Sequence, residues 1–221
     1  MDLLSLEIES LFRSVACSGA VMGDIKNISS KGKSGYFGHY KQYRGLDSGG
    51  IVSEKESALE SFTPARAAQI QFAEKYQPKA ITLTIGGNDT GFSDKIRECI
   101  SNPLQSCKYA TTQLAAGGKE IQNLFDELKA TYDAVHAASP RTKVYVVGYP
   151  KFVNSDIEIC LSTNVLLDKT EREYINQATM YLNDVVEAAA RSTGMTYIDI
   201  ENALEGNELC GRPQPFVNAN G

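Results

Sequence analysis

The chain has 221 residues, of which 42% are hydrophobic and 22% charged, as is usual for a soluble globular protein of one domain. Its 22 basic and 27 acidic residues give a formal net charge of −5, which argues against a nucleic-acid partner and a basic membrane-binding face. No apolar run approaches the roughly 18 residues that a membrane span needs. The acidic, amphipathic start of the chain also lacks the basic and apolar regions of a signal peptide.

The first part of the chain predicts a strand and then a long loop. Phe12–Cys17 is a short apolar run that predicts a strand, and Ser18–Ala20 predicts the loop after it. Residues 26–62 are rich in Gly, Ser and Lys and show little periodicity. We therefore expect a loop insertion at about 26–62.

A helix and a buried strand are predicted next. Thr63 and Pro64 predict a helix start, because Thr caps a helix and Pro fits its first position. The β-branched apolar run Ala80–Ile85 predicts a buried strand. Gly86–Asp89 then predicts a turn at the carboxyl end of that strand.

The second half of the chain continues the alternation of helices and strands. Apolar residues at helical spacing predict a helix over 118–138, and Lys143–Val147 predicts the next strand. Asp168 and Glu171 resemble a capping box, which predicts the start of another helix. Tyr197–Ile200 predicts the last strand.

This alternation predicts an α/β fold with a parallel sheet and helices on both faces. Active sites in such sheets lie at the carboxyl ends of the strands. Ser18–Ala20 and Gly86–Asp89 both follow predicted strands at that edge. The two turns are therefore placed where catalysis would need them.

The sequence Gly-Gly-Asn-Asp at 86–89 has a use in catalysis. Gly86 and Gly87 allow a sharp turn and a close approach of the backbone to a ligand. Asn88 can direct its side-chain N–H₂ group at a developing oxyanion, and Gly19 can offer a backbone N–H to the same oxygen. Taken alone, the pattern is equally compatible with two ordinary glycine-rich turns.

A resemblance to a known family favours the catalytic interpretation. Val15–Ala20 resembles block II of the SGNH (GDSL-type) hydrolases, and Ile81–Phe92 resembles block III, whose core is Gly-x-Asn-Asp. Further segments are similar to the bacterial lipase/esterase branch of that family: Cys99 to Cys107, Val144–Pro150, Glu208–Gly211 and Phe216–Asn218.

The resemblance implies a three-layer, doubly wound, flavodoxin-like sheet with strand order 2-1-3-4-5 and a single domain over residues 1–221. It implies a carboxylic ester hydrolase with a Ser nucleophile, in which Gly19 and Asn88 form part of the oxyanion hole. Gly86, Gly87 and Asp89 would support the turn, and Asp89 could instead cap the following helix. The family needs no metal or organic cofactor. The expected partner is a small-molecule, lipid or glycan ester, and we expect a monomer.

Two catalytic residues of the family have no counterpart here. No Gly-Asp-Ser precedes the block II segment, and no His follows Glu208–Gly211, while Asn207 stands where relatives often have a non-catalytic His. We therefore expect the chain to be truncated at both ends, to lack the first strand of the sheet, and to be inactive alone. A catalytically inactive SGNH-like binding domain remains an alternative, as does a flavodoxin-like domain of other ancestry.

Internal residues are poor substitutes for the missing nucleophile and base. Asp47 and Ser48 imitate Gly-Asp-Ser but follow block II, and Ser18 has no base nearby in sequence. His39 lies among loop aromatics, and His136 falls near a predicted helix end, where a His favours the helix dipole.

The five cysteines form no CxxC pair, and with two histidines they do not predict a zinc site. Cys99 and Cys107 flank a short loop, and Cys160 and Cys210 could close a long one. Each disulfide would stabilise the fold by roughly 2–4 kcal/mol. Five reduced thiols, with Cys17 unpaired in either case, remain the alternative. The disulfides and the resemblance together predict a secreted or cell-surface protein.

Overall fold

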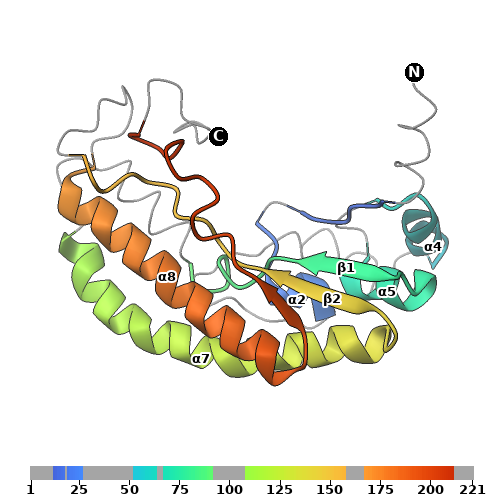
Figure 1. The fold of residues 1–221 in the computed structure, drawn as a ribbon. Helices are drawn as coiled ribbons and strands as arrows, with labels where there is room; N and C mark the ends of the chain where they lie inside the picture. The colour runs from blue at the N-terminus through green and yellow to red at the C-terminus, as the bar shows by residue number, and fades with distance from the viewer. Residues whose placement is uncertain are drawn as a thin grey trace, which may run out of the picture.

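The computed structural model describes residues 12–17, 19–26, 52–63, 67–91, 108–157 and 167–211. Within these residues, one parallel sheet has the strand order β1-β2-β3 (Figure 1). In its register Ala80 pairs with Lys143, and Tyr145 pairs with Thr196. The strands are β1 (Ala80–Leu83), β2 (Lys143–Val147) and β3 (Thr196–Ile198). The α/β class and the parallel order of these strands are thus confirmed.

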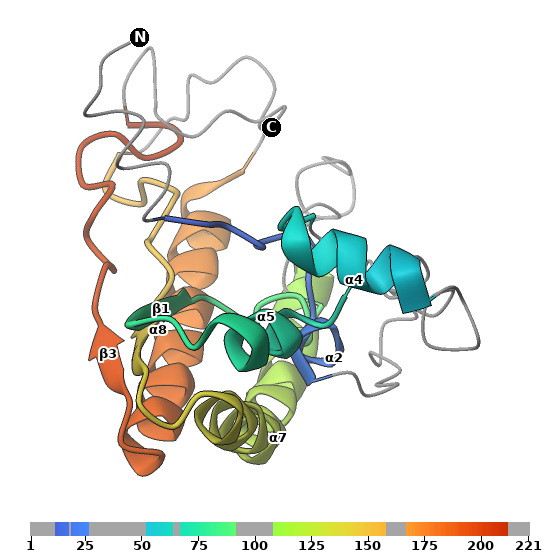
Figure 2. The same ribbon diagram turned by 90° about the vertical axis from the view of Figure 1, so that its right-hand side faces the viewer.

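The helices connect the strands and cover the sheet. The long helices α7 and α8 lie side by side beneath the sheet in Figure 1, and the turned view of Figure 2 shows the same pairing. The helices α2 and α5 pack against α7. The described helices are α2 (Met22–Lys26), α4 (Val52–Glu60), α5 (Gln69–Tyr76), α7 (Lys108–Ala138) and α8 (Lys169–Ser192).

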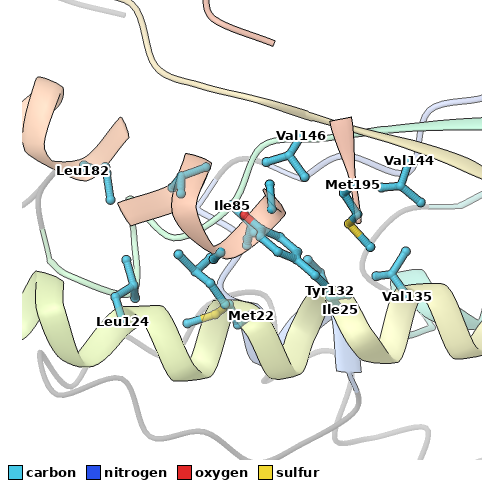
Figure 3. Packing of buried hydrophobic residues seen from close by; sticks show 14 of the residues in the cluster. Met22, Ile25, Ile85, Leu124, Tyr132, Val135, Val144, Val146, Leu182 and Met195 are labelled. Carbon is cyan, nitrogen blue, oxygen red and sulfur yellow. The ribbon is translucent and has the colours of Figure 1, made fainter. Parts of the chain in front are cut away.

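One apolar cluster lies between the sheet and these helices. Tyr132 of α7 lies in the middle of the cluster, between Met22 on one side and Val135 on the other (Figure 3). Leu182 of α8 and Val146 of β2 are fully buried in the same cluster. Burial of apolar surface contributes about 25 cal/mol per Å², so this cluster is the main source of stability in the described part of the chain.

The helix α8 begins as its sequence predicts. The Asp168 side chain accepts a hydrogen bond from the Glu171 N–H at 2.8 Å, and the Glu171 side chain accepts one from the Asp168 N–H at 2.9 Å. This reciprocal pair satisfies N–H groups that a helix start otherwise leaves unpaired. The helix ends just before Gly194, whose positive φ of 73° suits glycine.

The predicted strand at Phe12–Cys17 is wrong, because the structure forms no strand there. Phe12 is 64% exposed, and the Arg13 guanidinium lies 5.7 Å from the centre of the Phe62 ring. Only Cys17, at the end of the segment, packs against the apolar cluster. A six-residue apolar run can be satisfied by such side-chain contacts without joining a sheet.

The predicted loop at 26–62 and the helix start at Thr63 also need correction. Helix α4 lies inside the predicted loop. The Thr63 N–H donates to the Ala58 carbonyl at 2.9 Å, and its hydroxyl pairs with that of Ser61 at 2.7 Å, so Thr63 closes α4 rather than opening a helix. Helix α5 begins later, where the Gln71 side chain accepts from the Ala68 N–H at 3.1 Å.

Several element boundaries differ from the predictions. β1 ends at Leu83, two residues before the predicted end, and its side chains alternate between exposed and half-buried instead of being buried throughout. β3 covers Thr196–Ile198 rather than 197–200. Helix α7 starts at Lys108 rather than at 118, because it continues through Gly117 and Gly118, two residues that usually weaken a helix.

Candidate active site

The turn after β1 depends on glycine. Gly86 has a φ of 112°, a conformation that side chains rarely adopt. A Cβ at this position would lie 3.3 Å from methyl groups of both Leu124 and Leu128 of α7. Within the turn, the Thr90 hydroxyl donates to the Gly87 carbonyl at 2.8 Å. The turn therefore packs directly on the apolar cluster, and the positive φ and these close contacts together favour glycine at position 86.

Two side chains of this turn form hydrogen bonds with the backbone at the start of α2. The Asn88 Nδ2 donates to the Ala20 carbonyl at 3.0 Å, across 68 residues of sequence. The Asp89 Oδ1 accepts from the Met22 N–H at 3.0 Å, across 67 residues. Beside these contacts, Gly19 has a φ of 77°. The structure thus brings together the two turns that the sequence singled out, those of Gly19 and Asn88.

Asp89 is an electrostatically unusual group. Burial, with a smaller contribution from the nearby charge of Glu127, raises the pKa of its carboxyl group to about 6, although the hydrogen bond from the Met22 N–H acts in the opposite direction. Its Oδ2 atom is buried and has no hydrogen-bond partner within the described residues. The carboxyl group faces the protein, which suits a structural contact in the turn.

Tyr149 is a residue of this site whose role sequence reasoning missed. It follows β2 at the carboxyl edge of the sheet, and its hydroxyl accepts a hydrogen bond from the Gly87 N–H at 2.9 Å. The side-chain amide of Asn183 on α8 forms two hydrogen bonds with the backbone of Tyr149. The Tyr149 N–H donates to Asn183 Oδ1, and the Tyr149 carbonyl accepts from Asn183 Nδ2, each at 2.8 Å. The available signal was its position directly after a strand.

Two further candidates within the described residues, His136 and Asn207, make no hydrogen bond with this turn. His136 is exposed in the last turn of α7, close to where β2 begins, and therefore at the amino edge of the sheet. The Asn207 side chain donates only locally, to the Glu205 carbonyl at 3.3 Å. The other sequence candidates lie outside the described residues: Ser18, His39, Asp47, Ser48, Cys99, Cys107 and Cys160.

Two cysteines fall within the described residues. Cys17 is a free thiol, as predicted, and Cys210 is disulfide-bonded. Because the other cysteines are not described, the pairings of Cys99 with Cys107 and of Cys160 with Cys210 remain predictions. In the same described ranges, acidic, His and Cys side chains form no group of three that could hold a metal ion. No helix there is long and apolar enough to cross a membrane.

The fold is similar to that of solved α/β lipases. The structure is similar to an extracellular lipase from Streptomyces rimosus, with a TM-score of 0.59, 26% identity, and coverage of 76% of this chain and 75% of that one. It is also similar to a phospholipase A1 from Streptomyces albidoflavus, with a TM-score of 0.55, 28% identity, and coverage of 72% and 70%.

The sequence comparisons define the family. Residues 48–214 match the profile of the GDSL-like Lipase/Acylhydrolase family, and the chain belongs to that family. It is 31% identical to Lipase 1 of Streptomyces coelicolor over 131 residues, which are 59% of this chain and 46% of that protein. It is 32% identical to a lipase of Streptomyces rimosus, with the same coverage. The chain thus matches about half the length of these relatives. The predicted SGNH membership is confirmed.

Proposed function

We propose that this chain supplies the oxyanion-binding part of a carboxylic ester hydrolase. When a serine attacks an acyl carbonyl, negative charge develops on the carbonyl oxygen, and nearby N–H groups stabilise it. The Gly19 backbone and the Asn88 side chain would supply two of these donors. The observation that carries the proposal is the hydrogen bond from Asn88 Nδ2 to the Ala20 carbonyl at 3.0 Å, which keeps Asn88 beside residue 19.

The other residues of the turn would act by supporting these donors. Gly86 and Gly87 allow the sharp change of direction after β1, and Asp89 connects the turn to the Met22 N–H. Asp89 would not take part in the chemistry, because its bonded oxygen faces the backbone of the neighbouring segment. Its proposed role is to maintain the distance between the two donor-bearing turns.

One observation favours a second candidate function. Residues 1–221 contain no Gly-Asp-Ser ahead of Gly19, and their histidines are His39 and His136, both of which precede Asn207. An SGNH-like domain that binds an ester or a partner without turnover would need neither a nucleophile nor a base. Catalysis and binding therefore have to be distinguished by experiment.

The decisive experiment measures p-nitrophenyl acetate hydrolysis by two proteins. One consists of residues 1–221, and the other is the product of the complete open reading frame, with its Ser and His confirmed from its sequence. We expect hydrolysis by the second protein and none by the first. If the second protein were also inactive, the enzyme proposal would fail and the binding domain would be favoured.

Substitution of Asn88 tests the role of the turn in the active protein. We expect Asn88→Ala to lower kcat by about 10²–10³, the usual effect of removing one oxyanion donor. Asn207→Ala is the matched control, because that side chain makes only a local contact with Glu205. A kcat within twofold of wild type for Asn88→Ala would show that Asn88 does not bind the oxyanion.

The substrate and location are further parts of the proposal. The names of the similar proteins, lipase and phospholipase A1, support an acyl ester of a lipid, although an acylated glycan or a small acyl ester fits the same chemistry. The Streptomyces rimosus protein is described as extracellular, which supports export of this one. The disulfide-bonded state of Cys210 agrees with an oxidising compartment.

A further inference from the structure

Tyr149 contacts the oxyanion turn through its hydroxyl group and its ring. The hydroxyl oxygen accepts from the Gly87 N–H at 2.9 Å. A Cβ placed on Gly87 would lie 3.1 Å from this oxygen and 3.2 Å from the ring carbons Cε1 and Cζ. The phenol therefore lies directly against the backbone of Gly87, and glycine is what permits the approach. Burial raises the pKa of Tyr149 to about 12, so the phenol is neutral at physiological pH.

The backbone of Tyr149 is itself fixed by a second element. Asn183 is buried on α8 and uses both ends of its side-chain amide on Tyr149, accepting from the N–H and donating to the carbonyl, each at 2.8 Å. Gly148 precedes Tyr149, and a Cβ there would lie 3.0 Å from Asn183 Oδ1 and would overlap the Tyr197 hydroxyl. Close packing therefore restricts both the backbone and the hydroxyl of Tyr149.

This arrangement matters because two adjacent glycines form the first half of the turn. Gly86 and Gly87 lack the Cβ atoms that would restrict their dihedral angles. Asn88 follows Gly87 directly, so a rotation at Gly87 changes where the Asn88 amide points. An error of about 1 Å in the position of a catalytic group can cost about 10²-fold in rate. A contact that fixes the Gly87 peptide therefore acts together with the hydrogen bond from Asn88 to the Ala20 carbonyl to set the direction of the Asn88 side chain.

We propose that Tyr149 is a positioning residue for the oxyanion turn, acting through the hydrogen bond between its hydroxyl group and the Gly87 N–H. This inference rests on the proposed function, because it assumes that Asn88 binds the oxyanion. Tyr149 acts through Gly87 and need not touch substrate. Removing its hydroxyl should therefore weaken stabilisation of the transition state more than binding of the substrate.

The kinetic test uses Tyr149→Phe in the product of the complete open reading frame. We expect kcat for p-nitrophenyl acetate to fall about 10-fold to 100-fold, with KM changed less than threefold. Tyr145→Phe is the matched control: Tyr145 lies on β2, and its hydroxyl makes no hydrogen bond within the described residues. A kcat within twofold of wild type for Tyr149→Phe, or an equal fall in the control, would overturn the inference.

A second measurement needs no activity, and its first part needs only the wild-type protein. Amide hydrogen exchange at Gly87, followed by NMR in the wild-type chain, should be slow, because the N–H donates to a buried hydroxyl. In Tyr149→Phe it should be at least 10-fold faster, while exchange within β2 is unchanged. Unprotected exchange at Gly87 in the wild type would overturn the inference. If the Gly87 N–H exchanges slowly but the unsubstituted product of the complete open reading frame does not hydrolyse p-nitrophenyl acetate, the result would count against the proposed function alone.

Discussion

The apolar cluster under the sheet and the polar turn above β1 are stabilised in different ways. Leu182, Tyr132 and Val146 are each surrounded by several other apolar side chains, so many small contacts stabilise the cluster. The turn is instead joined to the neighbouring segment by two single hydrogen bonds: Asn88 donates to the Ala20 carbonyl, and Asp89 accepts from the Met22 N–H. Each of these bonds contributes modestly to stability, but each has a defined direction.

This difference teaches which changes should affect stability and which should affect geometry. A cluster of many contacts loses free energy roughly in proportion to the volume removed, and no contact within it is directional. In the turn, removal of one hydrogen bond costs less free energy than a cavity in the cluster does, about 1–3 kcal/mol, yet it also changes the direction of polar groups. Substitutions in the cluster should therefore lower the free energy of unfolding, and substitutions in the turn should mainly lower kcat.

The largest expected effect on stability is in the cluster. Leu182→Ala should lower the free energy of unfolding by about 2–5 kcal/mol, because Leu182 is fully buried on α8 and its truncation leaves a cavity. Urea denaturation measures the loss. Met180→Ala on the same helix is the control, since Met180 is 42% exposed and its truncation should change stability by about 0.5 kcal/mol or less. Equal losses for both variants would contradict the comparison.

The next effect is a pH dependence that originates in the turn. Because burial raises the folded-state pKa of Asp89 from 3.8 to about 6, the folded state binds this proton more tightly than the unfolded state. The contribution of Asp89 to stability is therefore greatest below pH 3.8 and decreases as the pH rises to about 6. The decrease should be at most about 3 kcal/mol.

Asp89→Asn provides the measurement. Thermal unfolding of wild type and variant between pH 4 and 7 should show the stability of the wild type falling relative to that of Asp89→Asn, because the amide does not titrate. Parallel curves for the two proteins would show that Asp89 titrates equally in the folded and unfolded states.

A smaller effect isolates the hydrogen bond itself. Asp89→Ala should be less stable than Asp89→Asn by about 1–3 kcal/mol, because only the amide still offers an acceptor to the buried Met22 N–H. Neither variant titrates, so the difference should not vary with pH. Chemical denaturation at pH 5 and pH 8 tests both points. Equal stability of the two variants would show that the hydrogen bond does not stabilise the fold.

The smallest effect comes from a similar contact outside the turn. Asp168 also accepts from a backbone N–H, that of Glu171 at 2.8 Å, but this contact is exposed at the start of α8. Asp168→Ala should cost about 1 kcal/mol, the usual value for a helix cap, and should leave kcat unchanged. If Asp168→Ala lowered kcat as much as Asn88→Ala does, the effect of Asn88→Ala on kcat would not be specific to the turn.

Much of the site could be predicted from sequence, because the turn is a local pattern. Gly86 and Gly87 lie directly before Asn88 and after an apolar run, so the turn and its place at the sheet edge can be inferred together. The capping box of Asp168 is local in the same way. The segment Phe12–Cys17 was misassigned because strand formation depends on a pairing partner, which a single short run does not reveal.

The contacts that fix the turn could not be predicted. Tyr149 meets Gly87 across 62 residues, and Asn183 meets Tyr149 across 34 residues. Neither separation follows from helix or strand periodicity. These contacts arise only when β1, β2 and α8 have packed, so their detection requires coordinates.

The packing around Gly148 has an evolutionary consequence. A side chain at this position would overlap the Tyr197 hydroxyl and press on the Asn183 amide. The effect of a mutation at 148 must therefore depend on the residue at 197, which is epistasis between positions 49 apart in the chain. Alanine at 148 requires the Tyr197 hydroxyl to shift or Tyr197 to be replaced by a smaller residue, so replacement of Tyr197 first makes the second mutation easier. A mutant library that varies position 148 alone should therefore be enriched in glycine, and less so in a background where Tyr197 is replaced by a smaller residue.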